Sequence, residues 1–474
     1  MATLTAPYAH PFGDAIRIDD GRLTVVRSAV VASDRMDQLA RDAVFGDDAT
    51  RSWARWLIWE LAQSVGVRPS SIHELYMARG RGLVEGFTVP AINVRGMAYD
   101  TARSIFRTAR RLDVGAFICE IARSEIGYTD QRPAEYTAVI LAAALREGFR
   151  GPVFIQGDHF QVNAKKYASD PRPEVDAVIQ LAREAVAAGF CNIDVDTSTL
   201  VDLQRQSLAD QQRLNVEVGA EIAGVVRSIQ PAGITISIGG EIGEVGTKNS
   251  TVEELRAYMD GFNAELAKRL GTVPGLSKIS VQSGTTHGGV VLPDGSIADV
   301  KLDFHTLEEL SRVARQEYGL AGAVQHGAST LPDTAFDHFP RTGTAEIHLA
   351  TNFQNMLYDG IPTALREDIY EWLRVNAKDE RKPSDTDDQF LYKTRKKALG
   401  PFKKSFWDLP ADVKQRLATT YDAKFEFLFK QLAVGSTSAT VADHVHPQEW
   451  HRPAPGTHGH GDVTAAPDDT DLSD

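Results

Sequence analysis

Short apolar runs alternate with longer amphipathic stretches through the middle of the chain. Eight such runs are rich in β-branched and small residues and end beside Gly, Asp, His or Ser. Helical patterns separate most of them, as at Pro133–Glu147 and Thr251–Leu270. Eight strands alternating with helices over about 300 residues predict an α/β fold, a closed (β/α)8 TIM barrel. The predicted strands are Phe87–Val94, Gly115–Ile121, Pro152–Gly157, Asn192–Asp196, Ile234–Gly240, Lys278–Gln282, Ala321–Gln325 and Ala345–Ala350.

An open, doubly wound sheet is the alternative to a closed barrel. No GxGxxG loop follows the first predicted strand to support a nucleotide-binding version of it. We therefore divide the chain into four parts by pattern. An N-terminal helical extension covers 1–72, the barrel 73–375, a linker with a C-terminal helical arm 376–434, and a disordered tail 435–474.

Two of these parts hold further patterns. In the extension, a short strand spans Arg22–Arg27, and Trp53, Trp56 and Trp59 indicate packing rather than a ligand platform. In the arm, an amphipathic helix opening near Pro410 should clasp the barrel or a second subunit. The tail is rich in Gly, Pro, His and Asp, and its histidines predict at most a weak adventitious metal site. They are His444, His446, His451, His458 and His460.

Composition narrows the choice of partner. The net charge of −13 argues against nucleic acid, because phosphate binding of that kind requires a basic face. The chain has no run of 18 apolar residues and no basic-then-apolar leader, so we expect a cytoplasmic protein without a membrane span. Cys119 and Cys191 lie inside apolar runs and indicate buried thiols in a reducing compartment.

Candidate chemistry gathers where the predicted strands end. His159, His287 and His326 follow three different strands, each beside a glycine or an aspartate. In a barrel, functional side chains lie at strand carboxyl ends, where three converging histidines suit a metal site open to substrate. A single histidine at a strand end could instead be an ordinary polar residue that forms hydrogen bonds and binds no metal.

The order of these motifs resembles the class II, zinc-dependent ketose-bisphosphate aldolases. Asp158-His159, then Glu241-Ile-Gly243, His287-Gly, His326-Gly-Ala-Ser329 and a strand ending in Ala350-Thr351 follow the family's sequence of motifs. Further similarities are Gly86–Val94, Val195–Leu200 and Lys301–Phe304. They resemble the family's first strand, its Ile-Asp-x-Ser-x-Leu strand and the segment after its second metal histidine.

This resemblance implies a role for each matched residue. His159, His287 and His326 would bind Zn²⁺ or another divalent first-row ion. A monovalent cation is a candidate for a second cofactor. Glu241 matches a carboxylate at or beside the metal, and Asp196 a carboxylate near it. Asp158 matches the base that takes the substrate's hydroxyl proton. The phosphate and substrate contacts would come from Asn93, Gly288, Gly327, Ser329 and Thr351.

The chain departs from the family pattern at three places. The loop after Glu241-Ile-Gly243 lacks the family's acidic cluster, which leaves Glu244 as the nearest group to handle the carbon-bound proton. His348 stands where the family has asparagine, and Ala350 where it has aspartate. His348 could donate a ring N–H to the substrate oxyanion, or it could be a packed core histidine. The basic residue expected after His287-Gly is replaced by Val290-Val-Leu292.

The resemblance implies reversible cleavage of a phosphorylated ketose into dihydroxyacetone phosphate and an aldehyde, through a metal-stabilised enediolate. We also expect the protein to bind a small phosphorylated sugar as its substrate and to form a homo-oligomer. Three alternatives remain. One is a catalytically silent subunit, favoured by the missing acidic loop. Another is a metal-dependent hydrolase, although Asn93-Val-Arg95 replaces the His-x-His pair usual there. The third is a Schiff-base aldolase, for which no predicted strand end offers a well-placed lysine.

Overall fold

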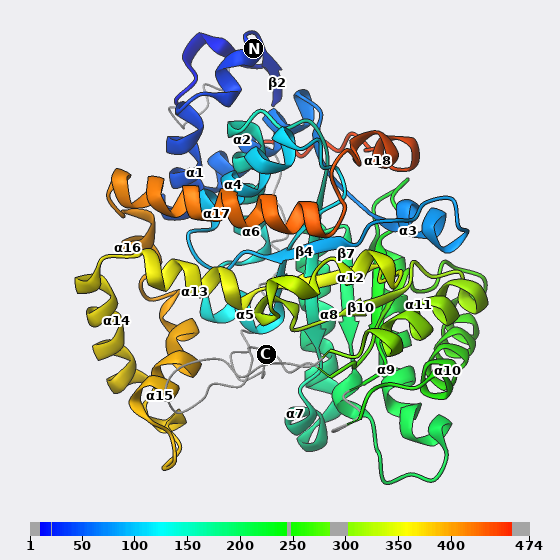
Figure 1. Cartoon of the computed structure of the whole chain (residues 1–474). Coiled ribbons are helices and arrows are strands. Elements are labelled where there is room, and N and C mark those ends of the chain that lie inside the picture. The colour runs from blue at the N-terminus through cyan, green and yellow to red at the C-terminus, as the bar shows by residue number, and fades with distance from the viewer. Residues whose placement is uncertain (1–9, 20, 244–247, 285–301, 457–474) are drawn as a thin grey trace.

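The barrel is the centre of the molecule (Figure 1). The computed structural model describes residues 10–19, 21–243, 248–284 and 302–456. Eight parallel strands close on themselves in the order β4-β5-β6-β7-β8-β9-β10-β11, with β11 paired to β4. The predicted (β/α)8 fold is confirmed. Its strands are β4 Val89–Asn93, β5 Ile118–Ala122, β6 Gly151–Gln161, β7 Asn192–Asp196, β8 Ser237–Glu241, β9 Lys278–Ser280, β10 Ala323–Gln325 and β11 Glu346–Leu349.

Helices surround these strands, and their ends follow local sequence signals. Thr251 and Glu254 form a capping box at the start of α10, in which each side chain accepts the other residue's backbone N–H. Gly189 ends α8 and Gly319 ends α11, both in the left-handed conformation that glycine favours. These helices are α4 Ala98–Arg111, α5 Arg123–Tyr128, α6 Pro133–Arg146, α7 Ala164–Ser169, α8 Pro171–Ala188, α9 Leu208–Ile229, α10 Val252–Leu270, α11 Phe304–Tyr318, α12 His338–Arg341 and α13 Thr351–Gly360.

The N-terminal extension contains a hairpin as well as helices. The predicted strand is present as β2 Arg22–Val25, paired antiparallel with β1 Ile16–Asp19. A short strand, β3 Val67–Ser70, runs parallel to the first residues of β6, and sequence patterning missed it. Pro69 cannot donate a ladder hydrogen bond, which is compatible with an edge position. The helices here are α1 Arg35–Phe45, α2 Asp48–Ser64 and α3 His73–Gly80.

The C-terminal arm lies against the barrel. Figure 1 shows α14 to α16 on the flank opposite α9 to α11, and α17 crossing between the barrel and the N-terminal helices. The amphipathic helix expected near Pro410 is α17, whose Leu417, Tyr421 and Phe425 are buried against α4 and α13. The arm consists of α14 Thr363–Asn376, α15 Asp387–Thr394, α16 Lys403–Trp407 and α17 Ala411–Gln431.

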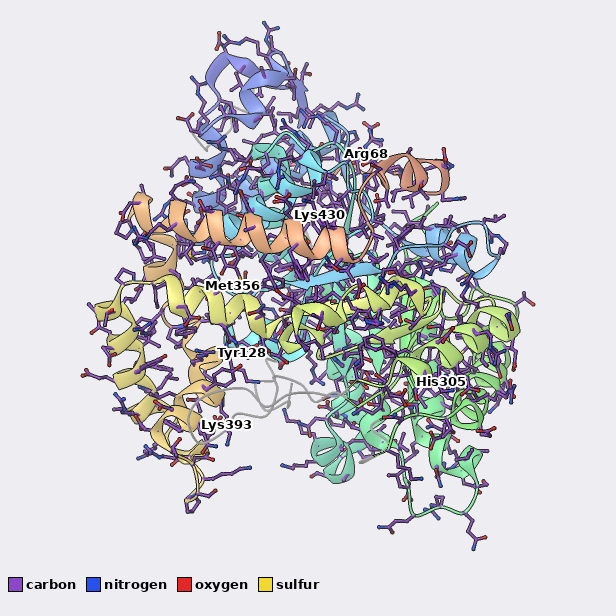
Figure 2. The ribbon with its side chains drawn as sticks, viewed as in Figure 1. Arg68, Tyr128, His305, Met356, Lys393 and Lys430 are labelled. Carbon is purple, nitrogen blue, oxygen red and sulfur yellow. The ribbon has the colours of Figure 1, made fainter. Side chains whose placement is uncertain are left out.

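The segment after residue 434 differs from the expected disordered tail. It forms α18, Ser438–His444, and then contacts the N-terminal part through residues such as Trp450 and Arg452. Arg68 donates to the Pro447 carbonyl, 3.3 Å away, close to α18 (Figure 2). Residues 445–456, which we call the C-terminal strap, therefore belong to the folded molecule. Among the described residues no helix has the length and apolar character needed to cross a membrane.

Candidate metal and catalytic site

A distortion in β6 directs two consecutive side chains into the barrel mouth. Asp158 and His159 are neighbours, and neighbours on a regular strand point to opposite faces. Here the pairing with β7 shifts register between Gly157 and Phe160, and His159 takes a left-handed φ of 38°. A Cβ on Gly157 would lie 2.5 Å from the Phe160 ring, so the distortion requires glycine there. As a result His159 Nε2 lies 3.9 Å from Asp158 Oδ1.

Three donors from three strands meet beside this distortion. One ligand atom from each of His159, Glu241 and His326 lies within 4.8 Å of the other two. His159 Nδ1 is 3.4 Å from a Glu241 oxygen, and the His159 and His326 rings are 4.2 Å apart. Imidazole nitrogen and carboxylate oxygen are the donors that zinc and other first-row divalent ions accept. The donor set therefore fits such an ion.

Neighbouring groups orient these donors. Asp196 Oδ2 lies 3.1 Å from His159 Nδ1, and it accepts a hydrogen bond from Gln161 Nε2 at 2.6 Å. The Ser280 hydroxyl is 2.9 Å from His326 Nε2. Carboxylates and hydroxyls that bind a ring nitrogen fix the orientation and tautomer of a metal histidine. Asp196 thus contacts the ring of His159, one of the three candidate donors.

The electrostatic environment favours a cation in the mouth. Burial, assisted by Asp196, raises the pKa of Glu241 to about 7. Burial would lower the pKa of His159, but Asp158 and Glu241 outweigh it and raise that pKa well above its ordinary value. Several carboxylates sharing a water-poor space repel one another, and a proton or a metal ion relieves that repulsion.

Asp158 remains ionised in this environment. Burial would raise its pKa, yet His159, His348 and Lys278 together lower it to about 2. Its side chain is 7% exposed, so the carboxylate is held in the barrel mouth with little contact to solvent. An ionised carboxylate next to a donor histidine is suitably placed to accept a proton from a bound substrate.

His348 faces carboxylates on both sides of its ring. Its Nε2 is 2.7 Å from Glu346 Oε1, while its Nδ1 is 3.1 Å from Asp158 Oδ1 and 3.2 Å from Glu120 Oε1. Burial would lower the pKa of His348, but the carboxylates raise it well above its ordinary value. Its Nε2 is engaged by Glu346, while its Nδ1 lies near two carboxylates without a hydrogen bond among the described residues.

A polar layer that sequence analysis missed lies directly below the mouth. Lys278 Nζ contacts Gln156 Oε1 at 2.8 Å, Asp194 Oδ2 at 2.9 Å and Glu346. A strand-period signal could have found the layer, because residues i and i+2 share one face of a strand. Each layer residue comes two positions before a residue of the mouth. Gln156 precedes Asp158 in this way, Asp194 precedes Asp196, Lys278 precedes Ser280 and Glu346 precedes His348.

Lys278 is a buried lysine inside the barrel, but it lies at the start of a strand and not at a strand end, where no well-placed lysine was expected. It is the first residue of β9 and 1% exposed. Burial lowers its pKa, but Asp194 and Glu346 outweigh burial and raise that pKa above its ordinary value. A lysine held as an ammonium ion by two carboxylates lacks the lone pair that Schiff-base formation requires. Its position serves to neutralise the layer.

The residues expected to bind substrate phosphate come from two adjacent loops. Gly327, with φ 66°, precedes the short turn that carries Ser329 after β10, and Thr351 begins α13 after β11. The Asn352 N–H points to Ser329 Oγ at 3.4 Å and so links the loops. Loops after the seventh and eighth strands, with a helix N-terminus, form a common phosphate site in such barrels.

Four further residues were expected to bind substrate or metal or to transfer a proton. Asn93 ends β4 and is buried, and its Oδ1 accepts a hydrogen bond from Arg95 Nε at 3.3 Å. Glu244, His287 and Gly288 lie outside the described residues. The third metal histidine and the candidate for the carbon-bound proton therefore stay predictions.

Comparison with known proteins adds a family match and a similar fold. The model of the family Fructose-bisphosphate aldolase class-II matches residues 82–405, more than half of the chain. A solved structure from Sinorhizobium meliloti, described as a probable tagatose 6 phosphate kinase, is similar with a TM-score of 0.52 and 17% identity. It covers 75% of this chain and 99% of its own, and at that identity it shows the fold alone.

Two further similarities are too weak or too short to indicate a function. A fructose-bisphosphate aldolase structure from Campylobacter jejuni has a TM-score of 0.47 and 17% identity, over 78% of this chain and 97% of its own. The small ribosomal subunit protein bS1 of Synechococcus is 34% identical over 117 residues. That match spans a quarter of this chain and only 34% of the ribosomal protein.

Proposed function

The chain belongs to the class II fructose-bisphosphate aldolase family, and from that premise we propose that it is a divalent-metal-dependent aldolase. The substrate would be a phosphorylated ketose, cleaved reversibly to dihydroxyacetone phosphate and an aldehyde. The observation that carries this proposal is geometric: Asp158 Oδ1 lies 3.9 Å from His159 Nε2, beside the donor set of His159, Glu241 and His326.

The donor set supplies the electrophilic side of the reaction. A divalent cation held there would act as a Lewis acid toward the carbonyl oxygen of the substrate. Zinc is the preferred candidate, because two imidazoles and a carboxylate suit it, with His287 expected as a further ligand. The orienting contacts of Asp196 and Ser280 keep the two described histidines in place without a large conformational change.

Asp158 supplies the basic side. As the carbon–carbon bond breaks, the hydroxyl on the aldehyde fragment loses its proton to the Asp158 carboxylate, and the electron pair of the broken bond moves to the ketone fragment. In the condensation direction Asp158 returns the proton. We propose His348 as a positioning residue, because its Nδ1 lies 3.1 Å from Asp158 Oδ1 and 3.2 Å from Glu120 Oε1, so that a charged ring would attract the Asp158 carboxylate.

The phosphate-bearing end of the substrate would lie on the loops after β10 and β11. Gly327, Ser329 and the first residues of α13 offer backbone N–H groups and hydroxyls there. Glycine allows close approach of an oxyanion to the backbone, and a helix N-terminus favours its negative charge. A ketose with a terminal phosphate would thereby present its carbonyl to the donor set.

A cleavage assay with a panel of ketose phosphates tests this function. We expect at least one to yield dihydroxyacetone phosphate, with cleavage abolished by a chelator and restored by zinc or another first-row ion. Borohydride added with the substrate should leave the activity intact, because Lys278 is held as an ammonium ion. Irreversible inactivation with reduced substrate on Lys278 would replace the metal mechanism with a Schiff base.

A further inference from the structure

A basic pocket lies at the opposite end of the barrel from the catalytic residues. It has a volume of about 460 Å³ and forms between α11, the end of α3 and the turn that precedes β11. His326 directly follows β10 and Glu241 is the last residue of β8, whereas the pocket residue Gly343 precedes β11. Anything bound here would therefore lie at the amino-terminal face, outside the aldolase site.

Four arginines contribute to the wall of this pocket. They are Arg81, Arg312, Arg315 and Arg341, and Glu308 is the acid that lines the pocket with them. In a chain with a net charge of −13, this is a local excess of positive charge. Volumes of roughly 300–1,000 Å³ are typical of small-molecule sites.

These arginines are incompletely neutralised by the protein. Within the described part of the chain, no ion pair or hydrogen bond of the Arg81 side chain is found. The guanidinium of Arg312 hydrogen-bonds the Gln316 amide oxygen at 3.2 Å, and the nearest carboxylate oxygen to Arg315 belongs to Glu85 at 3.9 Å. Arg341 alone has a close carboxylate, Asp337, at 2.5 Å.

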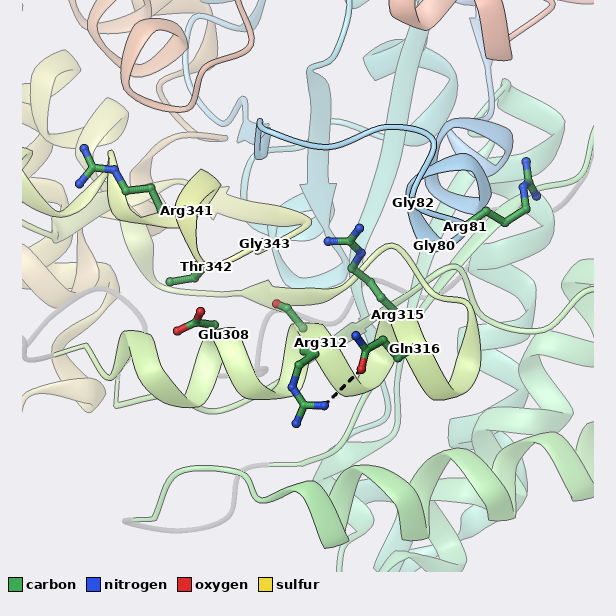
Figure 3. A pocket seen from close by; sticks show the side chains of 11 residues that line it. Gly80, Arg81, Gly82, Glu308, Arg312, Arg315, Gln316, Arg341, Thr342 and Gly343 are labelled. Atoms are coloured by element: carbon green, nitrogen blue, oxygen red, sulfur yellow. Dashed lines mark hydrogen bonds between the residues drawn. The ribbon is translucent and has the colours of Figure 1, made fainter.

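The arrangement suits more than one anionic group. Figure 3 shows Arg315 rising from α11 on the side of Gly343, while Arg312 turns along the helix toward Gln316. Arg81 and Arg341 lie on opposite sides of the pocket in that view. Because these two heads lie on opposite sides, separate anionic groups suit them better than a single one. Gly80, Gly82 and Gly343 also line the pocket and add no side chains to its wall.

We propose that this pocket binds a phosphorylated metabolite that carries two or more phosphate groups. Guanidinium groups bind phosphate oxygens in bidentate fashion and are weakly hydrated, so separated arginines can each hold one group. The binding is independent of the aldolase chemistry, because no pocket residue contacts the donor set of His159, Glu241 and His326.

The pocket is joined to the barrel through a buried arginine. Arg79 donates to the carbonyls of Ala321, Gly343 and Thr344, which precede β10 and β11. Burial and the nearby Arg315 lower the pKa of Arg79 to about 10. Positive charge is therefore concentrated around Arg315, and an anion in the pocket would relieve the repulsion between the two guanidiniums.

Titration calorimetry of the full chain with 2,3-bisphosphoglycerate tests the proposal directly. This probe carries two phosphates and measures binding without turnover. We expect the double variant R312Q/R315Q to weaken binding at least tenfold, and R81Q/R341Q to weaken it several-fold. The matched control is R213Q/R416Q, which removes the same charge from exposed arginines paired within their own helices, and it should bind as the wild type does.

Three results would overturn the proposal. The first is unchanged affinity in both pocket variants, and the second is an equal loss in the control. The third is loss of binding in S329A with the pocket variants unaffected, since the probe would then occupy the proposed substrate-phosphate loops. Unchanged melting temperatures of the pocket variants exclude misfolding as the cause of lost binding. Should R312Q/R315Q fail to fold, R81Q/R341Q, at exposed positions, still decides the question.

Discussion

At the scale of single residues, the barrel mouth separates metal binding from proton transfer. His159 belongs to the donor set, while its neighbour Asp158 lies 3.9 Å from it and is held by His348. Two consecutive residues can face the same space only because of the left-handed conformation at His159. Substitutions at these two positions should therefore affect different properties of the protein.

We predict that Asp158→Ala keeps bound metal near the wild-type level but loses roughly 10²–10⁴-fold in turnover, the usual worth of a general base. His159→Ala should lose the metal itself. The measurements are metal content by elemental analysis and the rate of cleavage of the same ketose phosphate. Near-normal turnover in the aspartate variant would remove Asp158 from its proposed role.

A second residue-scale prediction concerns pH and lies away from the metal. His73 begins α3, is 5% exposed, and its Nδ1 has no hydrogen-bond partner among the described residues. Burial, with Arg227 and Arg81, lowers its pKa to about 4 from 6.5. Between pH 6.5 and 4 the unfolded chain takes up a proton that the folded chain refuses, so stability falls as the pH falls.

At pH 5 this single group should cost about 2 kcal/mol relative to pH 7. His73→Leu removes the titration and supplies the comparison. Denaturant unfolding at both pH values should show a smaller loss between pH 7 and pH 5 in the variant than in the wild type. Equal losses in the two proteins would mean that His73 does not stay neutral in the folded state.

At the scale of elements, the strands were predictable and their ends were not. All eight barrel runs form strands, because each is short, apolar and bounded by helix patterns. The strand predicted at Lys278–Gln282 ends at Ser280, since the Gln282 N–H donates to Ser250 Oγ. That predicted at Ile234–Gly240 begins only at Ser237, since the Ile236 N–H bonds the Gln230 side chain. Such contacts come from residues that a local pattern does not contain.

The C-terminal strap shows the same limitation more strongly. Its composition is that of a disordered segment, yet the carbonyls of Trp450 and Arg452 accept the indole N–H groups of Trp59 and Trp56, at 2.6 and 2.9 Å. The Arg452 guanidinium lies 3.4 Å from the Trp59 ring centre. The partners are almost 400 positions apart in sequence, so only the three-dimensional structure reveals them.

We predict that removing residues 445–474 lowers the stability of the folded protein. Each buried indole N–H that loses its acceptor costs about 1–3 kcal/mol, and the cation–π contact is worth up to about 2 kcal/mol. A lower melting temperature for the truncated chain would show this. The point variant Arg452→Ala should produce part of the same decrease. If the truncated chain melts as the full chain does, the strap contributes nothing to stability.

At the scale of the whole molecule, the order of motifs along the chain predicted the residues at the mouth of the barrel but not the polar residues in its interior. The ends of parallel strands meet at one face, which is why separate motifs could be assigned to one site. The layer below, from Glu120 to Lys278 and Glu346, has no motif of its own and was found only in the structure. Its carboxylates and Lys278 nevertheless set the charge of Asp158 and His348.

The most direct test of the central claim is to titrate zinc back into chelated protein while measuring bound metal and ketose phosphate cleavage together. We predict that activity rises in proportion to bound zinc and saturates near one ion per chain, as expected for one open catalytic site. The His326→Ala variant should neither hold that ion nor recover activity. Metal-free protein that cleaves the substrate at an undiminished rate would contradict the proposed role of His159, Glu241 and His326.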